Sequence, residues 1–334
     1  MTKIRLGIVG CGSMSVSHAR RMKGISDVQI VSVCDLNMEF ASNYVENNLK
    51  GIEPRPVPYG SMSEMLAETK LDAVVIATPH ILHFQQGMQA LDTGCHVLME
   101  KPMVISAEHA YMLAKKVRAV GKVFVVGYNT PCTANFYFLR ECIRNQVFGE
   151  LELVSAYLTQ NWKSATKGSW RQDPKIAGGG QAFDSGAHLL NGVCWSVESK
   201  IAEVHAFVDN QDTPVDVNSS INIRFESGVF AGIVISGNSA KSGSHSVFVF
   251  ENGRIEIDGW NGNWIRVWEG SECLDPPTIT DDMSAGSPDQ NFVEAILGHA
   301  EARTSVENGI IHCELMDAIY ESDRTGQPVR PNRC

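Results

Sequence analysis

Several signatures that would place a chain in a broad class of protein are missing from these 334 residues. No apolar run approaches the roughly 18 residues that a membrane-spanning helix requires, so we expect no membrane partner. No apolar segment of the signal-peptide type precedes the first predicted strand, which favours a cytoplasmic location. Hydrophobic residues still make up 43% of the chain, as is typical of a protein with a full core, and the length predicts about two domains.

Paired cysteines and clustered positive charge are missing as well. The nine cysteines are scattered without a C-x-x-C pair or a regular spacing, at positions 11, 34, 95, 132, 142, 194, 273, 313 and 334. We therefore expect reduced thiols, no disulfide framework and no metal site. Aspartate and glutamate outnumber lysine and arginine by 38 to 28, for a net charge of −10, and no basic cluster stands out. Nucleic acid is therefore not an expected partner.

What the chain has is a glycine-containing turn between a strand and a helix near its start. A β-branched run, Ile4–Val9, leads into Gly10-Cys11-Gly12-Ser13-Met14-Ser15. Gly10 suits the tight turn, Gly12 lets the backbone approach a pyrophosphate, and a helix that begins near Ser13 directs N–H groups at phosphates. Ser15 stands where the third glycine of the dinucleotide-binding fingerprint is expected, but the flanking elements have the right order. We therefore assign Gly10, Gly12, Ser13 and Met14 to a dinucleotide-binding turn.

A carboxylate follows the next predicted strand, Val28–Cys34. Asp35 can accept hydrogen bonds from both ribose hydroxyls of an adenosine. It would repel a 2′-phosphate, and the residues after it, Leu36-Asn37-Met38, offer no arginine or lysine to neutralise one. The sequence therefore predicts NAD in preference to NADP. The alternative is an ordinary strand–turn–helix in which Asp35 only caps the helix.

Strand and helix patterns alternate over residues 1–126 and predict an α/β Rossmann domain with a doubly wound parallel sheet. The run Ala73–Ala77 is wholly apolar, as in a strand covered on both faces. It ends at Thr78-Pro79, at the carboxyl edge where such sheets bind ligands. The predicted strands are Ile4–Val9, Val28–Cys34, Ala73–Ala77, His96–Met99 and Val123–Val126.

Residues 127–334 predict an α+β domain with a large, mainly antiparallel open sheet. Strands are expected at 151–159, 201–208, 219–225, 229–236, 246–251, 254–257 and 264–269, after a helix at 136–147. Spacers such as Glu226-Ser227-Gly228 are typical of hairpins. One helix, 181–195, interrupts the strands. Helical periodicity returns at 289–325, and we expect these C-terminal helices to pack back on the first domain.

Two further clusters carry chemistry. Glu100-Lys101-Pro102 follows the strand His96–Met99, so Lys101 lies at the carboxyl edge of the parallel sheet. In Gly178-Gly179-Gly180…Asp184…His188 the last two residues are four apart and would share one face of a helix. A histidine can accept the proton of a carbinol near neutral pH, an ammonium stabilises the developing alkoxide, and a carboxylate orients the imidazole or a substrate hydroxyl.

The residues alone leave plainer interpretations open. Lys101 could be a solvated residue of a strand–helix loop, His188 a buried core histidine and Asp184 a helix cap. His80 and His83 are three residues apart and could suggest a metal pair, although no third ligand is near them in the sequence.

As a set, these separated motifs resemble those of the Gfo/Idh/MocA oxidoreductase family, named for glucose–fructose oxidoreductase and inositol dehydrogenase. The set comprises Gly10-x-Gly12, Ala77-Thr78-Pro79 with His83, Glu100-Lys101-Pro102, Trp170-Arg171, Gly178-Gly179-Gly180…Asp184-x-Gly186-x-His188 and the tail from Phe292 to Gly326. The resemblance implies a Rossmann domain joined to an open α+β domain whose sheet often forms the oligomer interface. Cofactor and substrate would meet between the two.

The resemblance also assigns roles to single residues. In similar enzymes the lysine that matches Lys101 hydrogen-bonds the substrate and the nicotinamide ribose. The residues that match Asp184 and His188 bind and deprotonate the reacting hydroxyl. Thr78, Pro79, His83 and Glu100 join the expected cofactor site, and Asn129, Trp170 and Arg171 join the expected substrate site. Thr130 departs from the family, because relatives often carry an arginine after the asparagine.

We predict an NAD-dependent dehydrogenase or reductase that acts on a secondary hydroxyl or ketone of a sugar, inositol or related cyclic polyol. A glycoside-cleaving enzyme that recycles bound NAD through oxidation and elimination is one alternative, and a sugar or NAD sensor without catalysis is another. An imine or enone reductase fits the Asp–His pair less well. Because strands 219–225 and 229–236 alternate apolar residues and helices to cover both sheet faces are scarce, we also expect a homodimer or homotetramer.

Overall fold

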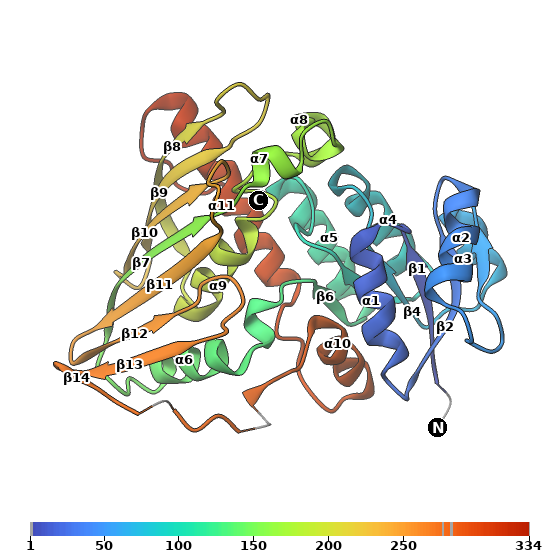
Figure 1. Ribbon diagram of the computed structural model, residues 1–334, viewed down its shortest axis with the longest axis horizontal. Coiled ribbons are helices and arrows are strands. Elements are labelled where there is room, and N and C mark those ends of the chain that lie inside the picture. Colours follow the sequence, from blue (N-terminus) through green and yellow to red (C-terminus); the bar gives the residue numbers. More distant parts are fainter. Residues whose placement is uncertain (1–2, 276, 281–282, 334) are drawn as a thin grey trace. The chain divides into compact units, whose positions relative to one another are not determined.

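The computed structural model of the protein describes residues 3–275, 277–280 and 283–333, shown in Figure 1. The chain divides into two compact units. Unit 1 comprises Met1–Val104, His109–Gly127 and Ser287–Glu307. Unit 2 comprises Ile105–Glu108, Tyr128–Gly286 and Asn308–Cys334. In the described part of the chain, no helix is both long and apolar enough to span a membrane.

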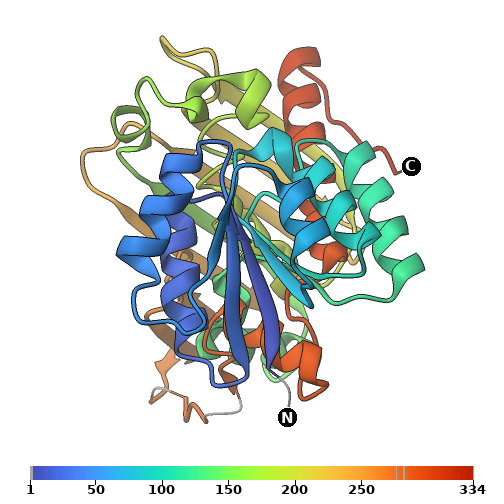
Figure 2. The same cartoon turned by 90° about the vertical axis from the view of Figure 1, so that its right-hand side faces the viewer.

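Unit 1 is built on a six-stranded parallel sheet in the order β3-β2-β1-β4-β5-β6. Helices lie on both sides of its strands (Figure 2). The strands are β1 (Ile4–Val9), β2 (Val28–Cys34), β3 (Val57–Tyr59), β4 (Ala73–Ile76), β5 (His96–Met99) and β6 (Phe124–Val126). The helices are α1 (Ser13–Lys23), α2 (Met38–Asn48), α3 (Met62–Glu68), α4 (His80–Asp92), most of α5 (Ala107–Val120) and α10 (Pro288–Leu297).

The predicted doubly wound sheet is confirmed. Strand order reverses between β1 and β4, so the carboxyl ends of these two strands flank the switch point at which such sheets bind ligands. Leu6, Ile8 and Val75 are at most 1% exposed, because covered parallel strands bury both faces. The edge strand β3 was not predicted. It has three residues and contains Pro58, so it lacks the apolar run of the other strands.

Unit 2 is built on an eight-stranded sheet in the order β14-β13-β12-β11-β7-β10-β9-β8, which Figure 1 shows strand by strand. Neighbouring strands are antiparallel except β7 and β10, which are parallel. The strands are β7 (Leu151–Thr159), β8 (Ile201–Asp209), β9 (Asn218–Phe225), β10 (Phe230–Ser236), β11 (Gly243–Phe250), β12 (Gly253–Ile257), β13 (Ile265–Glu269) and β14 (Glu272–Cys273).

One face of this sheet forms the core of unit 2. Val154, Ala156 and Leu158 of β7 alternate with exposed residues and pack in a buried cluster with Leu190 and Leu315 from two helices. The helical segments are η1 (Thr130–Cys132), α6 (Ala134–Arg144), α7 (Trp162–Ala165), η2 (Trp170–Gln172), α8 (Pro174–Ala177), α9 (Ala187–Val197) and nearly all of α11 (Val306–Thr325).

One sequence-based expectation about a helix was wrong. The helix expected at 181–195 begins only at Ala187, and residues 181–186 form turns. The backbone at Gly180 approaches Asp216 so closely that a Cβ there would lie 2.0 Å from the Asp216 carbonyl oxygen. The C-terminal helices also separate: α10 belongs to unit 1, whereas Leu315 and Ile319 of α11 lie in the core of unit 2.

Candidate active site

The Gly10–Ser15 turn of unit 1 has the backbone of a phosphate-binding turn. Gly10 has φ +89°, and a Cβ there would lie 2.7 Å from the Ala77 carbonyl oxygen, so glycine is required. A Cβ at Gly12 would meet nothing within 4 Å, which leaves the backbone open on that side. Gly12 caps α1 without a side-chain hydrogen bond, and the first turn of α1 holds no acidic residue. The helix N-terminus therefore suits an anionic phosphate.

Asp35 lies beside this turn. Its Oδ2 accepts a hydrogen bond from the Cys11 N–H at 2.9 Å, and its Oδ1 accepts one from the Asn37 N–H at 2.9 Å. Each carboxylate oxygen keeps a second lone pair for a ribose hydroxyl. The N-cap of α2 is Asn37, which accepts from Glu39 and Phe40, so Asp35 does not cap this helix.

His83 connects two turns at the carboxyl edge of the parallel sheet. It is fully buried, with Nδ1 2.9 Å from the Pro102 carbonyl oxygen and Nε2 2.9 Å from the Thr78 carbonyl oxygen. Burial lowers the pKa of His83 below its usual value. The Thr78 hydroxyl donates to Gln86 Oε1 at 2.5 Å, and Pro79 caps α4. His83 thus ties the turn after β4 to the turn after β5.

Within the described residues, no group of three or more histidine, cysteine, aspartate or glutamate side chains is arranged to hold a metal ion. The rings of His80 and His83 lie 5.8 Å apart and are tilted by 54°. Because both ring nitrogens of His83 face backbone carbonyls, its position is explained without a metal.

The Glu100-Lys101-Pro102 turn follows β5, as expected. The Glu100 carboxylate faces inward and is 7% exposed. Its Oε1 lies 2.8 Å from His18 Nε2, and its Oε2 accepts the Lys101 backbone N–H at 3.1 Å. Lys101 is half-buried and is joined to Pro102 by a cis peptide bond.

In unit 2, Asp184 is held by two donors. Its carboxylate is 3% exposed, and Oδ2 lies 2.9 Å from Trp162 Nε1 and 3.2 Å from Arg171 Nε. The Arg171 guanidinium also stacks 4.5 Å from the ring centre of Trp170. The predicted residues Trp170, Arg171 and Asp184 therefore lie together. Sequence analysis missed Trp162. The signal available for it was that the N–H of a buried tryptophan needs a hydrogen-bond acceptor.

His188 lies in the first turn of α9 and is 7% exposed. Its ring centre is 4.7 Å from that of Trp260 and 6.1 Å from that of Tyr128, both in edge-on arrangements. Asn129 follows Tyr128 and is exposed. The expected i, i+4 pairing of Asp184 and His188 on one helix was wrong, because only His188 is helical. Aromatic neighbours thus surround the histidine, and Trp260 could not be inferred from its own sequence surroundings.

A buried carboxylate fixes the loop that carries Asp184. Asp216 accepts hydrogen bonds from the Gly180 N–H at 2.6 Å, the Ala182 N–H at 2.7 Å and the Tyr320 hydroxyl at 2.6 Å. Burial raises the pKa of Asp216, although these hydrogen bonds favour its charged form. This loop anchor could not be inferred from the sequence, since its partners come from distant segments.

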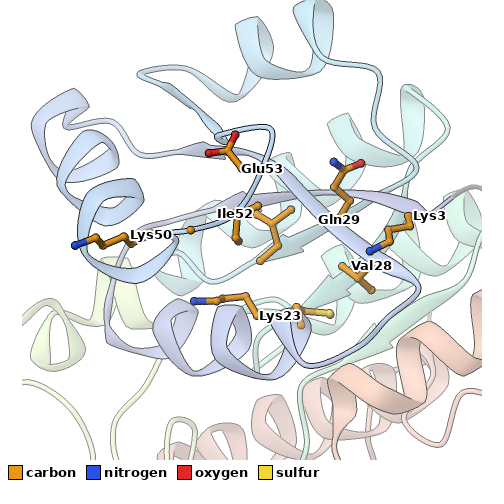
Figure 3. A pocket seen from close by; sticks show the side chains of 10 residues that line it. Lys3, Lys23, Val28, Gln29, Lys50, Ile52 and Glu53 are labelled. Atoms are coloured by element: carbon orange, nitrogen blue, oxygen red, sulfur yellow. The ribbon is translucent and has the colours of Figure 1, made fainter.

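A cavity of about 460 Å³ lies elsewhere on unit 1 (Figure 3). Lys3, Lys23, Val28 and Lys50 are among the residues that line it. Lys3 precedes β1 and Val28 begins β2. The cavity is therefore at the amino edge of the sheet, whereas the Gly10–Ser15 turn follows β1 at the carboxyl edge.

Comparison with known proteins agrees with this architecture. The family model of the GFO/IDH/MocA oxidoreductases, described as an NAD-binding Rossmann fold, matches residues 4–128. The model of the GFO/IDH/MocA C-terminal domain matches residues 136–264. The WlbA dehydrogenase of Bordetella pertussis, solved with NADH and UDP-GlcNAcA, superposes with a TM-score of 0.84 at 22% identity over 99% of this chain and 100% of its own. This likeness shows the shared fold.

Curated relatives include two sugar 3-dehydrogenases of similar length. The D-glucoside 3-dehydrogenase of Escherichia coli is 24% identical over 98% of this chain and 97% of its own. The glucose-6-phosphate 3-dehydrogenase of Bacillus subtilis is 25% identical over 97% and 98%. A glycosyl hydrolase family 109 protein of Akkermansia muciniphila is 28% identical over 51% of this chain and 38% of its own. Because the two family models together match most of the sequence, the chain belongs to the Gfo/Idh/MocA family of NAD-binding oxidoreductases.

Proposed function

We propose that the protein is an NAD-dependent dehydrogenase of a secondary hydroxyl on a sugar ring, with Lys101, Asp184 and His188 as its catalytic groups. The observation that carries this proposal is Asp184, a carboxylate buried beside Trp162 and Arg171 only four residues before His188. Burying a carboxylate is costly unless it is paired and hydrogen-bonded, and the contacts with Trp162 and Arg171 supply both and hold Asp184 in one place.

The residues of unit 1 fit the nicotinamide cofactor. Gly10, Gly12, Ser13 and Met14 would hold its pyrophosphate, and Asp35 would accept the adenosine ribose hydroxyls. Thr78, Pro79, His83 and Glu100 shape the adjoining turns, with Lys101 directed to the nicotinamide ribose. When bound, the cofactor supplies the hydride acceptor, and its reduced form supplies the donor.

The side chains of this chain perform the proton chemistry. His188 accepts the proton of the reacting hydroxyl at its imidazole, because a histidine is uncharged enough near neutral pH to act as a base. The Lys101 ammonium stabilises the negative charge that develops on the substrate oxygen. Asp184 is paired with Arg171 and accepts a hydrogen bond from a substrate hydroxyl. Asn129, Trp170 and Arg171 complete the substrate contacts.

The relatives suggest which carbon reacts. The D-glucoside and the glucose-6-phosphate dehydrogenase both act at position 3 of the sugar, and both match this chain almost end to end. We therefore propose a hexopyranose or its glycoside, oxidised at carbon 3, as the substrate. Inositols and other cyclic polyols present a similar ring hydroxyl and form the next group to test.

The test is a substrate screen with purified protein and NAD. Glucose, alkyl glucosides, glucose 6-phosphate, inositols and nucleotide-linked sugars are each supplied, NADH formation is followed by absorbance, and the oxidised carbon is located by NMR. We expect one group to give turnover that His188→Ala lowers by roughly 10²–10⁴-fold. Turnover that survives in both His188→Ala and Lys101→Ala would refute the assignment of the catalytic groups.

A second candidate is glycoside cleavage with recycled NAD, and the family 109 relative favours it. A ketone at carbon 3 acidifies the hydrogen on carbon 2, so a base removes that proton while the bond from carbon 1 to the leaving group breaks. Water would then add across the resulting double bond, with its oxygen on carbon 1 and a proton returned to carbon 2. Hydride return from the reduced cofactor, with a proton to the oxygen, would restore the hydroxyl at carbon 3. Release of nitrophenol from a nitrophenyl glycoside without accumulation of NADH would support this function over the dehydrogenase.

We also propose that unit 2 forms a homodimer or homotetramer through the outward face of its sheet. Tyr157 of β7 and Val234 of β10 are paired across strands and are 42% and 51% exposed, and Phe230 and Phe207 are 54% and 62% exposed. Such an apolar face marks an interface. Light scattering should give a dimer or larger, and Val234→Lys should shift it toward monomer. A monomeric parent protein at micromolar concentration contradicts this proposal.

A further inference from the structure

A buried cluster of charged side chains lies beneath the Glu100-Lys101-Pro102 turn in unit 1. His18 of α1 is 1% exposed, and the Asp289 carboxylate of α10 is fully buried. His18 Nε2 lies 2.8 Å from Glu100 Oε1, and His18 Nδ1 lies 2.7 Å from Asp289 Oδ1. Arg21, one turn further along α1, forms an ion pair with the other oxygen of Asp289.

This arrangement determines the charge of His18. Each ring nitrogen faces a carboxylate, and a carboxylate only accepts hydrogen bonds, so both nitrogens donate when the ring is an imidazolium. Burial opposes that charge, but the hydrogen bonds to Asp289 and Glu100 raise the pKa of His18 to about 9. The charged groups that face the ring are Glu100 from the end of β5, Asp289 from α10 and Arg21 from α1 itself. Two cations therefore balance two carboxylates.

The cluster connects directly to the backbone of Lys101. While Glu100 Oε1 contacts His18, Glu100 Oε2 accepts the Lys101 N–H at 3.1 Å. The backbone of Gly127 leaves little room beside Glu100, since a Cβ there would lie 3.2 Å from Oε1. The Glu100 carboxylate is therefore confined between His18, the Lys101 amide and Gly127. On the other side of Lys101, His83 contacts the Pro102 carbonyl oxygen.

We infer that His18 is a positioning residue for Lys101. His18 holds Lys101 in place through Glu100, and Asp289 holds His18. Its effect on turnover rests on the proposed function, whereas its effect on the Glu100-Lys101-Pro102 turn does not. A buried charged network is seldom the most stable way to fill a core, because desolvation offsets most of the attraction. We expect the benefit of this one to be a fixed orientation of the turn, because fully satisfied buried networks make their surroundings rigid.

The test compares His18→Asn with His96→Asn. His96 starts the same strand that leads to Glu100, and its Nδ1 accepts the Val123 N–H at 2.9 Å, but it lies at the opposite edge of the sheet. Hydrogen exchange of the Lys101 amide is measured in both variants. We expect roughly tenfold faster exchange or more in His18→Asn, because exchange reports how readily the hydrogen bond of an amide opens locally, and no change in His96→Asn. Glu100→Gln provides a second variant if His18→Asn does not fold.

Two more measurements separate the possible failures. NMR of labelled histidines should find that His18 titrates near pH 9; titration near the ordinary histidine value, or unchanged exchange at Lys101, overturns the inference. Steady-state kinetics should show a fall in kcat of about tenfold with little change in NAD affinity. Faster exchange with an unchanged kcat would support the inference that His18 positions the Glu100-Lys101-Pro102 turn. It would instead refute the proposed catalytic role of Lys101.

Discussion

The two units hold their candidate site residues by different means. In unit 1 the phosphate-binding turn depends mainly on backbone: Gly10 has the left-handed conformation, and the N-terminus of α1 follows within three residues. In unit 2 the position of Asp184 depends on side chains that are distant in sequence, because Trp162 is 22 residues away. The loop anchor Asp216 in turn binds Tyr320 across 104 residues. A local motif can therefore predict the shape of the first site, whereas the motif of the second site points to Asp184 but not to the distant side chains that hold it.

His188→Ala tests this contrast with the largest expected effect. Removal of the proposed base should lower kcat by roughly 10²–10⁴-fold, the usual contribution of a positioned acid–base group. NAD affinity should stay nearly unchanged, because the nucleotide-binding residues belong to unit 1. Steady-state kinetics and calorimetry measure the two effects. His205→Ala, on the half-buried strand β8, is the matched control and should leave both unchanged.

The pH dependence of stability tests the buried charges of unit 1. The pKa of His18 is raised to about 9 in the folded protein, against an unfolded value of roughly 6.5. Its stabilising contribution is therefore complete below about pH 6.5 and is lost as the pH rises to about 9. We expect a loss on the order of 3 kcal/mol in the free energy of unfolding across this window. Urea unfolding of His18→Asn should lack this slope, and a parallel pH profile in both proteins would contradict the prediction.

The next prediction concerns the preference of unit 1 for NAD over NADP. Asp35→Ser combined with Leu36→Arg should weaken NAD binding about 10- to 100-fold, since hydrogen bonds to a charged group contribute roughly 1.5–3 kcal/mol. NADP binding should strengthen, because the new guanidinium can pair with the 2′-phosphate. Calorimetry with both nucleotides measures the change. Leu36→Arg alone is the control, because Leu36 is 85% exposed and Asp35 still disfavours the phosphate. NADP affinity equal to NAD affinity in the parent protein would disprove the preference.

The smallest predicted effect belongs to the loop anchor of unit 2. Tyr320→Phe removes the hydroxyl that donates to Asp216 at 2.6 Å, which should cost about 1–3 kcal/mol of unfolding free energy. Because Asp216 also fixes Gly180 and Ala182, the KM for the sugar should rise several-fold. Tyr59→Phe, which loses only a hydroxyl contact with Thr69 in unit 1, should leave that KM unchanged. A rise in both variants would show that the effect is not specific to the loop.

The contrast between local and long-range contacts also explains which features could be predicted from the sequence. The parallel strands were predictable because covered strands such as β4 consist of apolar residues alone. The Gly10–Ser15 turn was predictable because the residues that its backbone requires are adjacent in the sequence. The turns at 181–186 were mistaken for helix, because their hydrophobic pattern continues into α9. The segment begins at the close approach of Gly180 to Asp216, a contact between separate segments that the local pattern does not contain. His18 was predicted only as part of a helix, since neither Glu100 nor Asp289 lies near it in sequence.

The position of Asp35 has a consequence for protein engineering. The carboxylate that would recognise the adenosine ribose also accepts the Cys11 N–H inside the phosphate-binding turn. The proposed specificity for the ribose and the shape of the turn would therefore both depend on the Asp35 side chain. A substitution chosen to change the first will loosen the second, so its effect will depend on the genetic background at positions 10–15. We therefore expect an exchange of cofactor preference to be epistatic, with compensating changes in the turn recovering affinity that the switch alone loses.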